Sequence, residues 1–302
     1  MILTVDIGNT NITIGLFKGD KLRFKENFPT SKAQGFGLFL RKELEAKIEI
    51  YKTTSIIAHK DSPPLVGGVR GGVNWRLATP TYPPPSRGRN YAQLFKTLCI
   101  EAAVICSVVP KATMVIKEAI SDLGHIPIYI LGQNLTVPIK NLYGQPKQVG
   151  QDRLVCAWAA MKLYGAPVIV VDSGTAITFD AVSKNREYLG GVILPGLNLS
   201  LRALHQGTAL LPQARLGKPG TLIGKDTKGS MLSGLVYGFG GLIDVLVEKL
   251  SREIGKKAKI VLTGGDARLI RQYCSKSYYF EPDLVLKGLK DLAHGKKNAK
   301  KT

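Results

Sequence analysis

Two short segments carry the residue types that a phosphate-binding site needs. The first is DIGNT (6–10), near the start of the chain, and the second is DSGT (172–175), about half a chain length later. Each follows an apolar run of strand-forming residues. The Asp offers a hard oxygen to a cation, the Gly permits close approach of a ligand, and turn N–H groups with the Thr hydroxyl can cradle phosphate oxygens. Two such turns facing across a cleft would hold a magnesium nucleotide from both sides.

Two further segments could complete such a site. In TGGDA (263–267), Gly264 and Gly265 leave flat backbone on which adenine or ribose could stack. In VGQDRL (149–154), Asp152 comes just before a helix-forming run and could accept the proton of an attacking hydroxyl, while Arg153 can fork onto a carboxylate or phosphate. Each motif also has a purely structural interpretation. The Asp/Gly/Thr turns could be ordinary hairpin connectors, and Asp152 could be a helix-terminal Asp paired with its neighbour.

Several other chemistries lack their sequence patterns. The chain contains neither the P-loop pattern GxxxxGK[ST] nor the dinucleotide pattern GxGxxG, which argues against the commonest alternative nucleotide folds. The cysteines show no CxxC or Cys/His metal spacing, and most stand in apolar surroundings. We therefore expect reduced core thiols at Cys99, Cys106, Cys156 and Cys274.

Composition favours an ordinary globular protein. With 302 residues, 44% hydrophobic and 21% charged, the chain suits one large domain or two medium ones. It has no apolar run of the roughly 18–20 residues that a membrane span needs, and its opening MILTVDIG lacks a secretory pattern, so a cytoplasmic location is expected. The net charge is +20, but the basic residues are dispersed except at 296–301 and aromatic residues are few. A solvated basic surface is favoured over nucleic-acid binding.

The hydrophobic pattern predicts strands alternating with helices. Residues 1–26 read as a β-meander, and a Pro/Gly/Arg-rich stretch at 59–91 interrupts the pattern and is predicted to be an inserted loop. Helices are predicted at 35–47, 112–123, 154–165, 198–211 and 229–254, and later strands at 101–110, 126–131, 166–172 and 258–267, with a second hairpin after 172. Alternating elements indicate an α/β protein, and the repeated hairpin indicates two related lobes.

In order and register, these motifs resemble those of the type III pantothenate kinases, a family of the acetate/sugar kinase and actin-like ATPase superfamily. The resemblance covers the chain except about 55–98, and its matching segments are DIGNTN (6–11), CSVVP (106–110), YGQPKQVGQDR (143–153), DSGTA (172–176), GGVILPG (190–196) and TGGDA (263–267). It implies an actin-like ATPase fold of two ribonuclease-H-like lobes, each a mixed sheet flanked by helices. The lobes would span 1–142, which holds the insertion, and 143–302, which ends in a basic tail at 296–302.

The resemblance implies ATP-dependent phosphorylation of the terminal hydroxyl of pantothenate to 4′-phosphopantothenate, the first step of coenzyme A biosynthesis. Asp152 would be the proton acceptor, Asp6 would hold Mg²⁺ through water, and Asp172 would bind a monovalent cation, K⁺ or NH₄⁺. The implied ATP contacts are Asp6, Ile7, Gly8, Asn9, Thr10, Asn11, Ile12, Thr13, Thr175, Gly264 and Gly265. The implied pantothenate contacts are Tyr143, Gly150, Gln151, Asp152, Arg153 and Thr208. The family resemblance also implies a homodimer whose interface helps to form the substrate site.

Two other functions compete with the kinase. One is a catalytically weak regulatory or accessory protein that keeps the same ATP-binding fold. Loss of the Asp in Gly-x-Asp-Arg would favour it, but Asp152 is present. The other is a basic nucleic-acid-binding protein, which salt-dependent retention on DNA would reveal.

Overall fold

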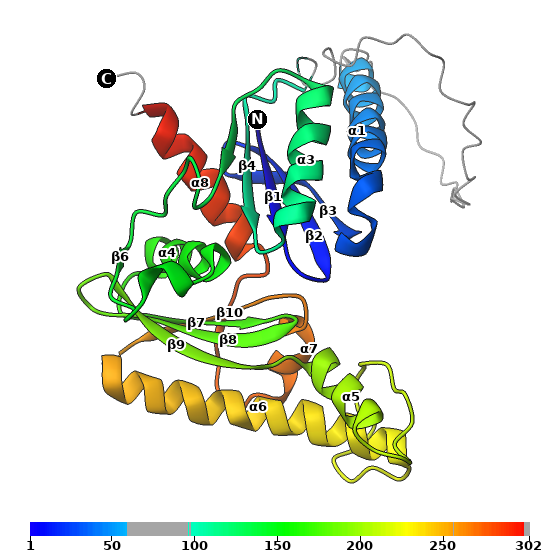
Figure 1. The fold of residues 1–302 in the computed structure, drawn as a ribbon, viewed down its shortest axis with the longest axis vertical. Helices are drawn as coiled ribbons and strands as arrows, with labels where there is room; N and C mark the ends of the chain where they lie inside the picture. Colours follow the sequence, from blue (N-terminus) through cyan, green and yellow to red (C-terminus); the bar gives the residue numbers. More distant parts are fainter. Residues whose placement is uncertain (59–95, 97, 256, 299–302) are drawn as a thin grey trace, which may run out of the picture.

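The computed structural model describes residues 1–58, 96, 98–255 and 257–298, without the side chains at 48–58 and 297–298 (Figure 1). The predicted insertion at 59–91 and the last residues of the basic tail lie outside the described part of the chain. The described residues form two mixed β-sheets with helices against their faces.

The first sheet has the strand order β3-β2-β1-β4-β5. Its strands are β1 (Ile2–Ile7), β2 (Asn11–Lys18), β3 (Lys21–Pro29), β4 (Ala102–Ser107) and β5 (Ile128–Ile130). The β1–β2 and β2–β3 pairs are antiparallel, whereas β1–β4 and β4–β5 are parallel. Its outer face is covered by α1 (Phe36–Ala58), which follows the short helix η1 (Thr30–Gly35), and by α3 (Pro110–Leu123).

The second sheet has the order β11-β10-β7-β8-β9-β6. Its strands are β6 (Lys140–Asn141), β7 (Val168–Ser173), β8 (Ala176–Val182), β9 (Glu187–Pro195), β10 (Lys259–Thr263) and β11 (Tyr279–Phe280). The helices of this half are η2 (Pro146–Gln148), α4 (Gln151–Tyr164), α5 (Leu197–Gln206), α6 (Thr227–Ile254), α7 (Ala267–Ile270), η3 (Arg271–Tyr273) and α8 (Leu284–Asn298).

The two sheets repeat one arrangement. In each, a strand that ends in an Asp-containing turn pairs antiparallel with the next strand and parallel with a later one. The order β3-β2-β1-β4-β5 therefore corresponds to β9-β8-β7-β10-β11, with β6 added at the edge of the second sheet. The predicted fold class, α/β with two mixed sheets flanked by helices, is confirmed. The predicted domain bounds, 1–142 and 143–302, stay a prediction.

Helices α4 and α8 form a layer between the sheets (Figure 1). Side chains alternate along a strand, so Leu3, Val5 and Ile7 pack on the outer helices while Ile2 and Asp6 face this inner layer. In β7, Val168 and Val170 face the same layer. Although α8 ends the described chain, it contacts β1, β2 and β4 of the first sheet.

The predicted elements are found with differences in their bounds, and helix α1 runs to Ala58 rather than 47. Helix α4 begins at Gln151 rather than 154, because Gly150 is extended and acts as its N-cap. Helix α5 ends at Gln206 rather than 211. Helix α8 was not predicted, although it packs closely against α4.

The prediction of core thiols is confirmed for Cys106 and Cys156, which are buried. It is wrong for Cys99, which is exposed in the turn before β4, and Cys274 is half-buried.

Helix α6 is the one described helix long and apolar enough, by length and composition, to cross a membrane. Its buried residues pack against β7, β8, α5 and α7, and 44% of its most apolar window is buried. An apolar face used for packing against a sheet accounts for this composition.

Candidate active site

The two Asp residues of the repeated turns occupy corresponding positions. Asp6 is the last residue but one of β1, and Asp172 is the last but one of β7. Each shares the face of its strand that packs on the inner helical layer, because each is an even number of residues from the side chains buried there. On the neighbouring parallel strands, Asp6 lies opposite Cys106 and Asp172 lies opposite Thr263.

The two turns meet each other directly. In the first, the Gly8 N–H donates to the Asn11 carbonyl at 2.9 Å, and in the second the Gly174 N–H donates to the Ala176 carbonyl at 3.0 Å. The hydroxyl oxygens of Thr10 and Thr175, one from each turn, are 3.0 Å apart and hydrogen-bonded. The sequence prediction that both turns face a shared site therefore agrees with this geometry.

Asp152 enters from the inner layer. It lies in the first turn of α4, where its Oδ1 accepts the backbone N–H of Arg153 at 2.8 Å. A Cβ at Gly150 would lie 2.3 Å from the same carboxylate oxygen, so the glycine leaves room for this position of the Asp152 side chain. The side chain of Gln151 packs against Gly132, so α4 starts in close contact with the segment that follows β5.

The three carboxylates interact electrostatically. Burial, together with the nearby charges of Asp152 and Asp172, raises the pKa of Asp6 to about 8. Burial, together with Asp152 and Asp180, raises the pKa of Asp172 to about 7. Acidic groups crowded in this way favour protonation unless a cation offsets their charge. Three carboxylates from β1, β7 and α4 thus make one acidic centre between the sheets.

A fourth carboxylate, which the sequence motifs did not identify, holds Arg153. Asp180 of β8 is fully buried and accepts from Arg153 Nε at 2.8 Å and from the Tyr188 hydroxyl at 2.7 Å. Thr178 donates to its other oxygen at 3.0 Å. An Asp on a largely apolar strand was the available signal, since buried charges are rare unless they are paired.

The Gly turn at the end of β10 adjoins the second phosphate turn. Gly264 has a positive φ of 98°, and a Cβ there would lie 2.4 Å from the Asp172 carboxylate. Gly265 lines an open pocket of about 630 Å³, together with Asp266, Arg268 and Lys218. The predicted adenosine turn is therefore placed next to the turn predicted to bind phosphate.

The side chains of four predicted site residues make other contacts in this structure. Ile7 and Ile12 are fully buried in the core of the first sheet, so only their backbone could meet a nucleotide. The Thr13 hydroxyl donates to Asn27 on β3 at 2.9 Å. Thr208 follows α5 and hydrogen-bonds to Leu204 and Leu211, and no hydrogen bond or ion pair given for the described residues links it to Asp152 or Arg153.

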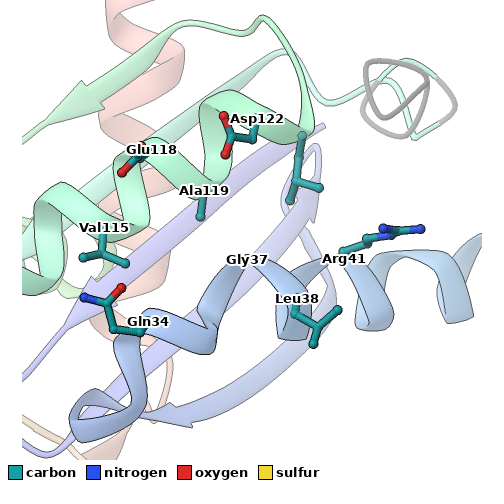
Figure 2. A pocket seen from close by; sticks show the side chains of 9 residues that line it. Gln34, Gly37, Leu38, Arg41, Val115, Glu118, Ala119 and Asp122 are labelled. Carbon is teal, nitrogen blue, oxygen red and sulfur yellow. The ribbon is translucent and has the colours of Figure 1, made fainter. Parts of the chain in front are cut away.

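A second pocket lies away from this centre. It measures about 400 Å³ and is lined by α1 and α3, with Leu38, Arg41, Glu118 and Asp122 around it (Figure 2). These helices cover the face of the first sheet opposite to Asp6. The pocket therefore lies outside the acidic centre.

The acidic centre does not resemble a preformed metal cage. Among the described residues, no three His, Cys, Asp or Glu side chains could hold a metal ion together. One or two carboxylates completed by phosphate oxygens and water are a usual environment for Mg²⁺. Asp6 and Asp172 fit such a partial site, because each is a crowded carboxylate whose charge a cation would offset.

Residues 74–249 match the sequence model of the family described as type III pantothenate kinase. The chain is 33% identical to a type III pantothenate kinase of Agathobacter rectalis over 99% of both chains, and 34% identical to one of Rubrobacter xylanophilus over 97% of both. The chain belongs to the type III pantothenate kinase family.

A solved structure has a similar fold. A crystal structure from Campylobacter jejuni, described as a Baf family transcriptional activator, is similar in fold with a TM-score of 0.52 and 17% identity, over 98% of this chain and 99% of that one. The chain carries the Asp residues of both turns and the Gly-x-Asp-Arg segment on which the sequence resemblance rests. The predicted family assignment is confirmed.

Proposed function

We propose that this chain transfers the γ-phosphoryl group of ATP to the terminal hydroxyl of pantothenate, giving 4′-phosphopantothenate and ADP in the first step of coenzyme A biosynthesis. The observation that carries the proposal is the contact between the two Asp-containing turns, with Asp6, Asp152 and Asp172 near enough to one another to interact electrostatically. Family membership supports the choice of substrate.

In this proposal Asp152 is the proton acceptor. The pantothenate hydroxyl would donate to its carboxylate while the hydroxyl oxygen attacks the γ-phosphorus, and ADP leaves on the opposite side. Oδ1 already accepts from the Arg153 N–H, so the group is held at the start of α4 and Oδ2 can face the hydroxyl. Phosphoryl transfer depends mainly on positioning and charge neutralisation, for which two turns and one base suffice.

The ATP phosphates would lie along the two turns. Thr10 and Thr175 supply hydroxyls at the point where the turns touch, and Gly8 and Gly174 supply flexible backbone. The pocket beside Gly265 gives room for the nucleoside. Because the phosphates are anionic and the centre is acidic, ATP would bind as its Mg²⁺ complex, with Asp6 as a ligand through water. A monovalent cation, K⁺ or NH₄⁺, at Asp172 would offset the second buried carboxylate.

Pantothenate would lie along the start of α4, near Tyr143, Gly150, Gln151 and Arg153, as the family motif suggests. It is a monoanion, and Arg153 is the basic side chain hydrogen-bonded at this point of the second sheet. Thr208 would have to join these residues by a movement of the segment after α5 or from a second copy of the chain. We propose a homodimer in the cytoplasm on the same family grounds.

The experiment is a pantothenate-dependent ADP-release assay on the full chain. We expect ADP release only when ATP, pantothenate, Mg²⁺ and either K⁺ or NH₄⁺ are all present. ATP consumption that pantothenate does not stimulate under these conditions would refute the assignment. Omitting only the monovalent cation tests the proposed cation site at Asp172 separately. Full activity without this cation would remove that site from the proposal but leave the kinase assignment intact.

A further inference from the structure

Asp180 makes a network that the proposed reaction has not used. It is fully buried on β8, and every hydrogen bond given for its carboxylate comes from a side chain: Arg153, Tyr188 and Thr178. The Tyr188 ring is also fully buried. An ionised carboxylate in such surroundings is costly unless its oxygens are satisfied, and here three donors satisfy them.

The network leaves one donor of Arg153 unused. Both Nε and Nη2 lie 2.8 Å from the same oxygen of Asp180, but only Nε has hydrogen-bond geometry. Nη2 is buried and has no hydrogen-bond partner among the described residues. A buried N–H group without an acceptor is rare in folded proteins and calls for an explanation.

The surroundings of Nη2 are those of the proposed pantothenate site. A Cβ on Gly191 would lie 3.2 Å from Nη2 and 1.6 Å from the Phe179 carbonyl oxygen, so β9 packs closely against β8 and Arg153 at this point. A Cβ on the adjacent Gly190 would lie 3.0 Å from the ring of Tyr143. Tyr143 and Arg153 are both predicted substrate contacts, and the β9 glycines thus lie between them.

We propose that Asp180 is a positioning residue for Arg153, and that Tyr188 fixes Asp180, so that the guanidinium is already held in place when the carboxylate of the substrate binds beside it. This rests on the proposed function, which supplies the anionic substrate. A free Arg side chain loses much rotamer entropy when it binds, whereas a guanidinium already held by Asp180 loses little. The arrangement therefore favours a substrate that carries a carboxylate at the end remote from the reacting hydroxyl.

The alternative is that Asp180 only stabilises the second lobe. The chain offers a matched control for this: Asp244 on α6 is also buried and accepts from the Ser275 N–H at 2.6 Å and from the Tyr278 hydroxyl. It lies on the opposite face of the second sheet, in the α6 layer. Asp244→Asn therefore removes a comparable buried Asp–Tyr pair without touching Arg153.

The test is a double-mutant cycle on kcat/KM for pantothenate, with Asp180→Asn, Arg153→Gln and the double variant. We expect Asp180→Asn alone to lower kcat/KM about tenfold, mostly through KM, and to change it less than twofold when Arg153 is already Gln. The inhibition constant of pantothenyl alcohol, which lacks the carboxylate, should change less than twofold in Asp180→Asn. Asp244→Asn should leave kcat/KM, KM and the inhibition constant of pantothenyl alcohol within twofold of their values in the unmodified chain.

Equal effects of Asp180→Asn with and without Arg153 would overturn the inference, because a purely structural residue acts independently of Arg153. A rise in kcat/KM would also overturn it, since Asp180 would then compete with the substrate for the guanidinium. If Asp180→Asn does not fold, Tyr188→Phe replaces it in the cycle with Tyr278→Phe as its control, and the same criterion applies. An inactive unmodified chain would instead refute the proposed function itself.

Discussion

Substitution of Gly150 by Ala tests the position of the proposed base with little change elsewhere. Gly150 has φ −58° and ψ 141°, a conformation that Ala adopts without strain. The added Cβ would lie 2.3 Å from Asp152 Oδ1, where an ordinary contact begins at 3.4 Å. The Asp152 carboxylate must therefore move by about 1 Å, while the backbone keeps its path.

A displacement of this size is large for a catalytic group. Misplacement of about 1 Å commonly lowers the rate about 10²-fold, because the reacting atoms leave their aligned arrangement. The Asp side chain can rotate away cheaply, so the unfolding free energy should change by less than about 1 kcal/mol. We thus expect kcat to fall about 10²-fold with an almost unchanged Tm.

The assay is pantothenate-dependent ADP release, run beside thermal unfolding. Gly144→Ala is the matched control, since it lies in the same segment before α4 and its Cβ would meet nothing within 4 Å. That variant should keep both kcat and Tm. A Gly150→Ala enzyme with kcat within threefold of the unmodified chain would refute the reasoning, because Asp152 would then tolerate displacement from the place assigned to it.

Three further outcomes are expected. Asp152→Asn should slow turnover about 10²-fold or more while ATP still binds, and a near-normal rate would remove Asp152 from the role of base. The pKa values of Asp6 and Asp172 are raised on folding from 3.8 to about 8 and about 7, so the folded state holds protons that the unfolded chain releases. The contribution of these two groups to stability without cations should therefore be greatest below about pH 4 and fall as pH rises to about 8, and Mg²⁺ with K⁺ should raise Tm more at pH 8 than at pH 5; equal cation effects at both pH values would contradict this. Gly191→Ala would place a Cβ 1.6 Å from the Phe179 carbonyl oxygen and should lower the unfolding free energy by about 1–3 kcal/mol in denaturant titration, whereas Gly217→Ala, with no neighbour within 4 Å, should not.

The sequence predicted most of the elements that carry the site, because each has a strong local pattern. The strands β1 and β7 are apolar runs that end in Asp-containing turns, and α4 follows a Gly that acts as its N-cap. The repeated turn also indicated two related lobes, which the matching strand orders bear out. Local patterns of this kind do not depend on how the lobes are packed together.

The missed features depend on long-range packing. Asp180 could not be linked to Arg153 from the sequence, since its role depends on the pairing of β8 with β7 and on the placement of α4 against that sheet. Helix α8 was overlooked, and its place between the sheets is fixed partly by Lys290, which is buried and paired with the exposed Asp20 of the β2–β3 turn. Side-chain roles of this sort emerge only when distant segments are brought into contact.

The two phosphate turns are equivalent in place but differ in length. Four residues separate the paired Ile7 and Ile12 in the first hairpin, whereas three separate Ser173 and Ile177 in the second. The longer turn brings Thr10 across to Thr175, so the two sheets touch at the point where phosphates are proposed to lie. A triphosphate between the turns must replace this hydrogen bond with bonds to its own oxygens. The hydroxyls that now join the lobes would then be the groups that bind the phosphates, so nucleotide binding and the relative position of the two sheets are coupled through this pair.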